Sequence, residues 1–223
     1  MANTLTAFPA DAVLSRLFAA AARDDEVRSS LASGYAEPSA SDRARSAAER
    51  SVAAQDIYMP VSAEGGRLLY AMLRAARPET VVEFGTSFGI STIFLAAAVT
   101  DNGTGRVVTT ELSSRKAAAA RSNLEEAGVA RVVTLLEGDA LETLADVPGP
   151  VGFVLLDGWK DLYLPVLHLL EPRLAPGAVV VADDNSFASV ASYLAYVRDP
   201  GNGYVSVEFP VQDGMEISSW TGR

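Results

Sequence analysis

Three acidic residues stand at the ends of three consecutive strand-like segments, where each is placed to accept hydrogen bonds from a ligand. Glu83 precedes a glycine loop, Gly85 to Gly89, that leads into an apolar helical segment. Glu111 ends the second strand-like segment and Asp139 follows the third. Glycines let a ligand approach the backbone closely, and the amides at the start of the next helix favour an anionic group. The pattern predicts a cofactor site at one end of a sheet.

The loop also distinguishes between classes of cofactor. It lacks the third glycine of the dinucleotide-binding pattern, and Glu83 would repel a pyrophosphate but attract a cationic amino group. Glu111 lies 22 positions after Gly89, the usual place for an acid that binds ribose hydroxyls. S-adenosylmethionine fits, because its amino group, ribose and adenine amine can each meet one acceptor. The alternative is that these carboxylates only cap the following helices, as Asp139 is placed to do.

A second group of candidates follows the fourth and fifth strand-like segments: Asp157 and Lys160 after the fourth, and Asp183, Asp184 and Asn185 after the fifth. Carboxylate and carboxamide oxygens are hard ligands that suit Mg²⁺. A divalent ion lowers the pKa of a hydroxyl bound to it, and a lysine whose own pKa the ion depresses can take the proton. The simpler alternatives are a helix cap at Asp157, a solvated amine at Lys160 and an Asx turn at Asn185.

Together these segments resemble the class I methyltransferases, and from residue 151 onward the chain is similar to the catechol and caffeoyl-coenzyme A O-methyltransferase family. The likeness covers about residues 81–220 and includes Glu-Phe-Gly-Thr-Ser-Phe-Gly at 83–89 and Asp-Gly-Trp-Lys-Asp at 157–161. It implies transfer of the methyl group of S-adenosylmethionine to a hydroxyl of a small, aromatic, catechol-like acceptor. It also implies that Mg²⁺ assists deprotonation, with Lys160 as the base and Asp157 as a catalytic and metal-binding residue.

The same resemblance implies a role for each residue that matches the family's motifs. The cofactor residues are Glu83, Gly85, Thr86, Ser87 and Ser91 near the methionine part, Glu111 at the ribose, Asp139 with Ala140 at the adenine, and Asp157 and Trp159 beside them. Glu208 resembles a glutamate that contacts the acceptor, although a glutamate on an edge strand usually faces solvent. Met59 is a further candidate for contact with cofactor or substrate, although a methionine there more often packs.

The metal motif of this chain departs from that of the family. The family has a single Asp-Asn pair, whereas this chain has Asp-Asp-Asn at 183–185. Counting from Gly177 favours Asp183 and Asp184 as the ligands, and residue identity favours Asp184 and Asn185. The first pair is preferred, with Asn185 as the third choice.

Strand-like and helical segments alternate through the core, which predicts an α/β fold. Strands are expected at 80–84, 106–111, 131–136, 151–156 and 178–182, and helices at 90–99, 114–127, 141–146 and 162–174. Right-handed crossovers arrange such units in a doubly wound, Rossmann-like, mostly parallel sheet. A helix at 187–198 and strands at 204–209 and 215–220 add a C-terminal antiparallel hairpin and bring the sheet to seven strands.

The length of 223 residues is that of a single domain, with the cofactor-binding core at 78–223. Helical segments rich in alanine are expected before it, at 11–32, 39–55 and 64–76. By resemblance to the family, residues 1–60 form a lid or a dimer contact, so a homodimer is expected.

The composition excludes several functional classes. With 28 acidic and 18 basic residues, the net charge of −10 disfavours nucleic acid and anionic membranes as partners, so the expected partner is a small-molecule acceptor. No apolar run is long enough to span a bilayer and the N-terminus lacks the basic start of a signal peptide, which predicts a cytoplasmic location. Cysteine is absent and the single histidine, His168, is expected to be structural, so a metal here would be bound by oxygen.

Three other functions remain open: a methyltransferase that acts without metal or on nitrogen or carbon, a nicotinamide-dependent reductase, and a non-catalytic cofactor-binding module. The reductase would need the missing glycine and, for the short-chain type, a tyrosine four residues before a lysine, which neither Lys116 nor Lys160 has. Intact Asp157 and Lys160 argue against the non-catalytic module.

Overall fold

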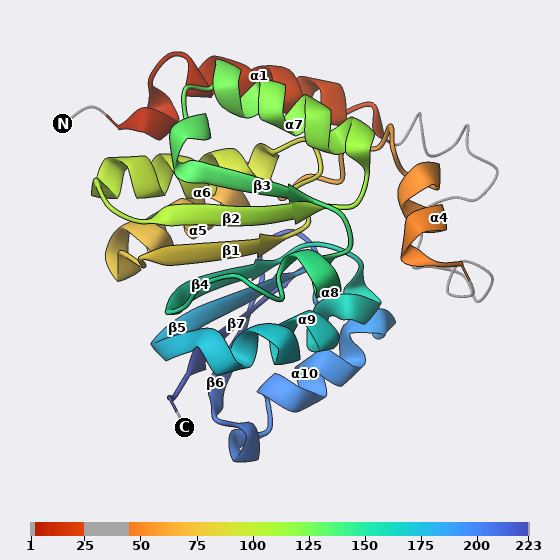
Figure 1. The fold of residues 1–223 in the computed structure, drawn as a ribbon, viewed down its shortest axis with the longest axis vertical. Coiled ribbons are helices and arrows are strands. Elements are labelled where there is room, and N and C mark those ends of the chain that lie inside the picture. Colours follow the sequence, from red (N-terminus) through yellow and green to blue (C-terminus); the bar gives the residue numbers. More distant parts are fainter. Residues whose placement is uncertain (1–2, 25–44, 223) are drawn as a thin grey trace.

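A central β-sheet carries the fold, and its parallel part brings the carboxyl ends of the strands to one edge (Figure 1). The computed structural model describes residues 3–24 and 45–222, and within them the sheet has seven strands in the order β3-β2-β1-β4-β5-β7-β6. The strands are β1 Thr80–Phe84, β2 Arg106–Glu111, β3 Val133–Glu137, β4 Val151–Leu156, β5 Leu174–Asp183, β6 Tyr204–Phe209 and β7 Met215–Trp220. The first five in chain order run parallel, whereas β7 pairs antiparallel with both β5 and β6.

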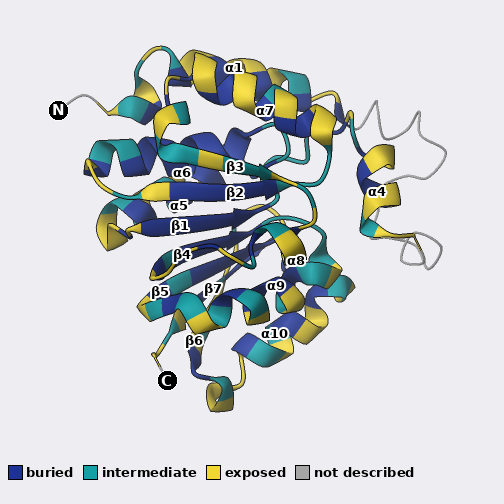
Figure 2. Ribbon diagram, in the orientation of Figure 1, coloured by how far each residue is buried: buried dark blue, intermediate teal, exposed yellow. Residues whose placement is uncertain are grey.

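Helices cover both faces of the sheet. On one face lie α1 Ala10–Ala21, α5 Ala63–Ala76, α6 Ile90–Asn102 and α7 Ser114–Glu126, and on the other lie α8 Ala140–Thr143, α9 Tyr163–Leu170 and α10 Ala191–Val197. Neighbouring residues of β1 belong to the two layers in turn, since Val81 packs with the first set and Val82 with the second. The central strands are therefore buried on both sides (Figure 2), which explains their continuous runs of β-branched and apolar residues.

The fold expected from the sequence is confirmed, and the differences lie at the ends of elements. β3 begins at Val133, because Ala130–Val132 form a 3₁₀ turn. α9 ends at Leu170, where a 3₁₀ turn contains Pro172, and β5 then begins at Leu174, earlier than expected. Proline has no backbone N–H to donate, so it favours the end of a regular helix. The helices expected at 141–146 and 187–198 are shorter, as α8 and α10.

The N-terminal segment contributes α1 and α4 Ala47–Ala53 to the described part of the chain. Residues 25–32 of the helix expected at 11–32 and residues 39–44 of the helix expected at 39–55 lie outside the described residues. α4 begins after Ser46, whose hydroxyl accepts a hydrogen bond from Glu49 N while the Glu49 carboxylate accepts one from Ser46 N. This capping box supports a helix of only seven residues. α4 lies on the side where the arrows of β2 and β3 end (Figure 1). Among the residues that the structure describes, no helix is long and apolar enough to cross a membrane.

Candidate functional site

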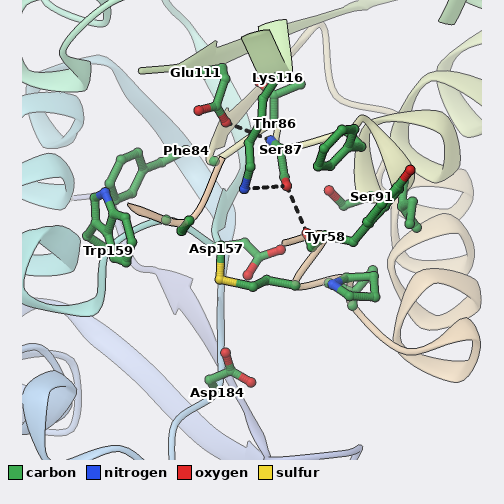
Figure 3. A pocket seen from close by; sticks show the side chains of 18 of the residues that line it. Tyr58, Phe84, Thr86, Ser87, Ser91, Glu111, Lys116, Asp157, Trp159 and Asp184 are labelled. Atoms are coloured by element: carbon green, nitrogen blue, oxygen red, sulfur yellow. Dashed lines mark hydrogen bonds between the residues drawn. The ribbon is translucent and has the colours of Figure 1, made fainter. Parts of the chain in front are cut away.

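A cavity of about 580 Å³ opens at the carboxyl ends of the parallel strands, and Figure 3 shows its wall. The residues from the sequence analysis that line it are Met59, Gly85, Thr86, Ser87, Ser91, Glu111, Asp139, Ala140, Asp157, Trp159, Lys160 and Asp184. Those that do not line it are Glu83, Asp183, Asn185 and Glu208. The structure therefore brings members of both predicted groups around one cavity.

The loop after β1 approaches the end of β4 so closely that only glycine fits at position 85. Gly85 has a φ of 106°, and a Cβ there would lie 2.5 Å from the carbonyl oxygen of Asp157. Asp157 N in turn donates a hydrogen bond to the carbonyl oxygen of Phe84 at 2.8 Å. The glycine loop and Asp157 therefore meet at the level of the backbone and share one part of the cavity.

Glu83 is fully buried behind the cavity wall. Its Oε2 accepts hydrogen bonds from the hydroxyls of Thr92 at 2.5 Å and Thr109 at 2.6 Å, whereas Oε1 has no hydrogen-bond partner. Burial raises the pKa of this carboxyl, although the hydroxyls around it, that of Ser91 included, oppose the rise. Glu83 thus holds β1 against β2 and α6 and does not line the cavity, whereas the sequence analysis placed it near the methionine part of the cofactor.

Glu111 is held at the edge of the cavity by two backbone amides. Its Oε2 accepts a hydrogen bond from Ser87 N and its Oε1 accepts one from Ser113 N, both at 2.8 Å. A carboxylate oxygen accepts more than one hydrogen bond, so both oxygens can still receive ligand hydroxyls. The two amides fix the orientation of the side chain in advance, and this geometry suits the ribose contact expected at this position.

Asp139 both caps a helix and lines the cavity. Its Oδ1 accepts a hydrogen bond from Leu141 N at 2.8 Å, which makes it the N-cap of α8. The residue is exposed and precedes the buried Ala140, and both belong to the cavity wall. The second carboxylate oxygen of Asp139 is left for a ligand, so the capping role and a role at the adenine are compatible.

Three carboxylates gather where β4 and β5 end. One oxygen from each of Asp157, Asp183 and Asp184 lies within 4.8 Å of the others. Asp183 Oδ1 is buried without a hydrogen-bond partner. Burial, and after it the charge of Asp184, raises the pKa of Asp183 to about 7, and burial together with the charge of Asp183 raises the pKa of Asp157. Such a group of hard oxygen ligands suits a divalent cation such as Mg²⁺.

Lys160 lies between these carboxylates. Its Nζ is 2.8 Å from Asp184 Oδ2 and 3.6 Å from Asp157 Oδ1, and it donates a hydrogen bond to the Tyr163 hydroxyl at 2.7 Å. Burial alone would lower the pKa of Lys160, but the negative groups around it outweigh burial and raise the pKa well above its ordinary value. The acids that face the amine directly cause this rise, whereas the depressed pKa expected from the sequence depends on a divalent ion beside Lys160.

Arg50 is a wall residue that the sequence analysis missed. It is buried on α4, its guanidinium carbon lies 4.8 Å from the centre of the Trp159 ring, and it donates two hydrogen bonds to Asp161 at 2.8 and 2.9 Å. These contacts join α4 to the Asp-Gly-Trp-Lys-Asp segment. The capping pattern at Ser46 and Glu49 predicts the start of a helix, but nothing in the sequence indicates that this helix contacts residue 159.

Lys116 is a second wall residue, which the sequence analysis weighed only as a candidate reductase lysine. It is buried in the first turn of α7, and its Nζ donates a hydrogen bond to Ser87 Oγ at 3.2 Å (Figure 3). Ser87 Oγ in turn donates to the carbonyl oxygen of Tyr58 at 2.8 Å. Two sequence features could have identified Lys116 as a site residue: it is one of only two lysines, and it follows Glu111 by five positions.

Asn185 and Glu208 also lie outside the cavity wall, as Glu83 and Asp183 do. The Asn185 side chain donates to the buried Glu216 at 3.5 Å, so its amide nitrogen is directed toward β7. Glu208 is exposed on β6 and forms an ion pair with Arg198 at 3.3 Å, which places the expected acceptor contact away from the cavity. His168 is also exposed, on α9, and does not line the cavity.

Comparison with known proteins agrees with this arrangement. A model of the methyltransferase domain family matches residues 82–185, which carry most of the cavity wall described above. The chain is 33% identical over 178 residues to catechol O-methyltransferase B of Danio rerio, a match that covers 74% of this chain and 66% of the relative. It is 38% identical over 125 residues to the catechol O-methyltransferase of Mycobacterium tuberculosis, with 56% of each chain covered. The chain thus spans less than two thirds of the length of these relatives.

A solved structure extends the similarity over most of the chain. The O-methyltransferase TomG from Streptomyces achromogenes, which is involved in tomaymycin synthesis and was crystallised in complex with S-adenosylmethionine, superposes with a TM-score of 0.64. The two sequences are 26% identical, and the match covers 90% of this chain and 98% of the other.

Proposed function

This chain belongs to the class I S-adenosylmethionine-dependent O-methyltransferases, and from that premise we propose that it methylates a hydroxyl of a small, catechol-like aromatic acceptor. The observation that carries the proposal is the meeting of two groups of side chains at one cavity. Glu111 and the glycine loop line this cavity together with Asp157, Asp184 and Lys160. A cofactor and an acceptor bound there would be close enough to react.

The cofactor side is supported by hydrogen-bonding groups that are already fixed. Glu111 offers two oriented oxygens to the ribose, and Asp139 offers the oxygen that its helix cap leaves free. Gly85 lets the loop pack directly on the backbone of Asp157, which holds the loop in the cavity wall. None of these groups requires a phosphate, which agrees with S-adenosylmethionine as the cofactor.

The acceptor side is supported by the apolar part of the wall. Met59, Pro60, Trp159, Leu162 and Phe187 line the cavity, and apolar and aromatic lining of this kind is typical of sites that bind small molecules. The acids and Lys160 at the base of this wall would then receive the polar edge of the acceptor. Adjacent hydroxyls on an aromatic ring satisfy both requirements.

A divalent metal, Mg²⁺ by its ligand chemistry, is part of the proposal. Asp157, Asp183 and Asp184 would hold it, and the unpartnered Asp183 Oδ1 is the observation that fits a cation at this place. When bound, such an ion would lower the pKa of an acceptor hydroxyl and balance the carboxylate charge that raises the pKa of Lys160.

The residues of the chain would then position and deprotonate the acceptor. As the acceptor oxygen bonds to the methyl carbon, the bond from that carbon to sulfur breaks, and the sulfonium becomes the neutral thioether of S-adenosylhomocysteine. The hydroxyl proton would pass to Lys160 Nζ, which lies beside Asp157 and Asp184 and accepts a proton only as the neutral amine. Most of the acceleration would come from alignment of the two bound molecules.

Transfer without a metal is the second candidate, and one contact favours it. The ammonium of Lys160, 2.8 Å from Asp184, already supplies a cation to the carboxylate cluster. In that reaction Lys160 would donate a hydrogen bond to the acceptor oxygen, and Asp157, whose pKa is raised by burial, would take the proton.

The N-terminal segment is proposed to act as a lid and as a contact in a homodimer. The lid is supported by Arg50, which attaches α4 to the cavity wall through Trp159 and Asp161. The dimer is tested by the mass of the purified protein in light scattering, where the mass of one chain would argue against it.

The experiment that tests the function is transfer of labelled methyl groups from S-adenosylmethionine to a panel of diphenols, with and without Mg²⁺ after chelation. Asp157→Ala is compared with Asp146→Ala, which changes an exposed acid outside the cavity wall. Activity that needs both Mg²⁺ and Asp157 supports the metal-assisted reaction. Activity that needs Asp157 but not Mg²⁺ supports the second candidate. Activity that needs neither, or failure of the wild type to bind the cofactor, contradicts both.

A further inference from the structure

Lys116 places an enclosed ammonium group in the cavity wall (Figure 3). The residue is only 4% exposed, yet it belongs to the lining of the cavity. Its Nζ donates to Ser87 Oγ at 3.2 Å and lies 5.5 Å from the centre of the Phe88 ring. Because an ammonium has three N–H donors, the hydrogen bond to Ser87 leaves two for another partner.

No carboxylate in the described part of the chain neutralises this ammonium by direct contact. Within residues 3–24 and 45–222, no carboxylate oxygen lies within 4.0 Å of Nζ. Burial lowers the pKa of Lys116 to about 8, although the more distant charges of Glu111, Asp24, Asp157 and Asp56 oppose the shift. A buried cation without a counter-ion is costly, so an anion that arrives from the cavity is bound favourably.

Glu111 does not serve as the missing counter-ion. Each of its oxygens accepts a hydrogen bond from a backbone amide, that of Ser87 or that of Ser113. The carboxylate is thereby held in place at the end of β2 and cannot turn toward Lys116 without breaking one of these bonds. Within residues 3–24 and 45–222, Lys116 is therefore left without a contacting carboxylate, and the anionic group of a bound molecule could pair with it.

We propose that Lys116 binds the carboxylate of the methionine part of the cofactor, an inference that rests on the function proposed above. This carboxylate is the only anionic group of S-adenosylmethionine, whose ammonium and sulfonium would be repelled by Lys116. Ser87, which accepts the hydrogen bond from Lys116, belongs to the loop that leads into α6, and Ser91 lies in the first turn of that helix. Lys116 therefore reaches the same end of the cavity from α7.

A purely structural role is the contrasting explanation. Ser87 has a φ of 47°, an unusual conformation for a serine, and its contact with Lys116 helps to hold it. Both roles use the same hydrogen bond, but only the binding role depends on whether the ligand has a carboxylate. The ligand, rather than the protein alone, must therefore be varied.

The test compares S-adenosylhomocysteine with its decarboxylated form by calorimetry on the wild type, Lys116→Met and Lys116→Arg. Arg115→Met is the matched control, since it removes one positive charge from the neighbouring, exposed position of α7, where the arginine pairs with Asp56. Lys116→Met is expected to weaken binding of the carboxylate ligand about tenfold and to change binding of the decarboxylated ligand by less than about twofold. Lys116→Arg and the control should bind both ligands as the wild type does.

Two results would overturn the inference. If Lys116→Met weakens the binding of both ligands equally, Lys116 only holds the loop in place. If the substitution weakens the binding of neither ligand, Lys116 has no part in binding. A wild type that binds neither ligand would instead remove the proposed function, and this inference with it.

A second measurement keeps the inference testable if Lys116→Met does not fold. The chain has only two lysines, Lys116 and Lys160, so wild-type protein labelled with ¹³C at lysine Cε gives two signals, which Lys116→Arg assigns. S-adenosylhomocysteine is expected to raise the pKa read from the Lys116 signal, because the bound carboxylate favours the charged amine. The decarboxylated ligand should leave that pKa unchanged or lower it. The same response to both ligands would overturn the inference.

Discussion

Gly85 lies so close to Asp157 that a single Cβ at position 85 would come within 2.5 Å of the Asp157 carbonyl oxygen. The cofactor loop and the first residue of the carboxylate cluster are therefore fixed relative to one another by backbone contact, without an intervening side chain. Because the same Asp157 is also hydrogen-bonded through its N–H to Phe84, the ends of β1 and β4 move together.

Replacement of Gly85 by alanine should therefore impair both halves of the site. We expect Gly85→Ala to lower the free energy of unfolding by about 3 kcal/mol, through an unfavourable φ and a backbone clash, and to weaken cofactor binding at least tenfold. Gly103→Ala is the control, since Gly103 also has a positive φ but has open space around it. Gly103→Ala should lower the free energy of unfolding by about 1 kcal/mol and leave cofactor binding unchanged. Equal effects of the two variants in denaturant unfolding would contradict this account.

The side-chain directions at the end of β5 predict which residues would bind the proposed Mg²⁺. Asp184→Ala should raise the Mg²⁺ concentration for half-maximal activity about tenfold or more, since it removes a carboxylate from the cluster. Asn185→Ala should change it by less than about twofold, because the Asn185 amide donates to Glu216. The reverse order in Mg²⁺ titrations of activity would show that residue identity, and not position after Gly177, determines the ligands.

Arg50 should control how firmly α4 closes over the cavity. We expect Arg50→Met to increase hydrogen exchange of the α4 amides about tenfold and to raise the KM for the acceptor more than it lowers kcat, because the hydrogen bonds to Asp161 are lost. Arg121→Met is the control, because it removes an exposed ion pair with Glu137. It should change neither the hydrogen exchange of the α4 amides nor the KM for the acceptor. Unchanged exchange in Arg50→Met would mean that α4 is held by other contacts.

The pKa of Lys116 predicts a pH dependence of cofactor binding. The free protein holds this pKa at about 8, below the ordinary value for lysine, and a bound carboxylate would raise it. Affinity should therefore be full below about pH 7 and should fall as the pH rises through 8, because binding above that pH must take up a proton. Calorimetric titrations across this range check the sign, and Lys116→Met should lack the step.

The sequence could predict the positions of the acids because the carboxyl ends of parallel strands share one edge of a sheet. Glu111, Asp139 and Asp157 each end a segment whose apolar pattern marks it as a buried strand, so their meeting at the cavity follows from the fold. The direction in which each side chain points at that edge cannot be predicted from the fold alone. Glu83 faces Thr92 and Thr109 behind the wall, and this depends on packing between β1, β2 and α6.

Contacts between distant segments account for the remaining differences. Asn185 is directed by Glu216, a residue 31 positions away, and Arg50 reaches Asp161 across 111 positions. Neither partner can be identified from local spacing. The pKa of Lys160 also depends on which acids surround it, and the sequence indicated the acids without the distances that make their effect exceed that of burial.

Acidic side chains outnumber basic ones around the cavity, and this imbalance treats the two forms of the proposed cofactor differently. S-adenosylmethionine has a net positive charge at neutral pH, whereas S-adenosylhomocysteine is neutral overall. The negative potential of the cavity would attract the first from a distance and exert little pull on the second. Methyl transfer would thus abolish the long-range attraction that brought the cofactor in, and exchange of product for fresh cofactor would slow as ionic strength screens that field.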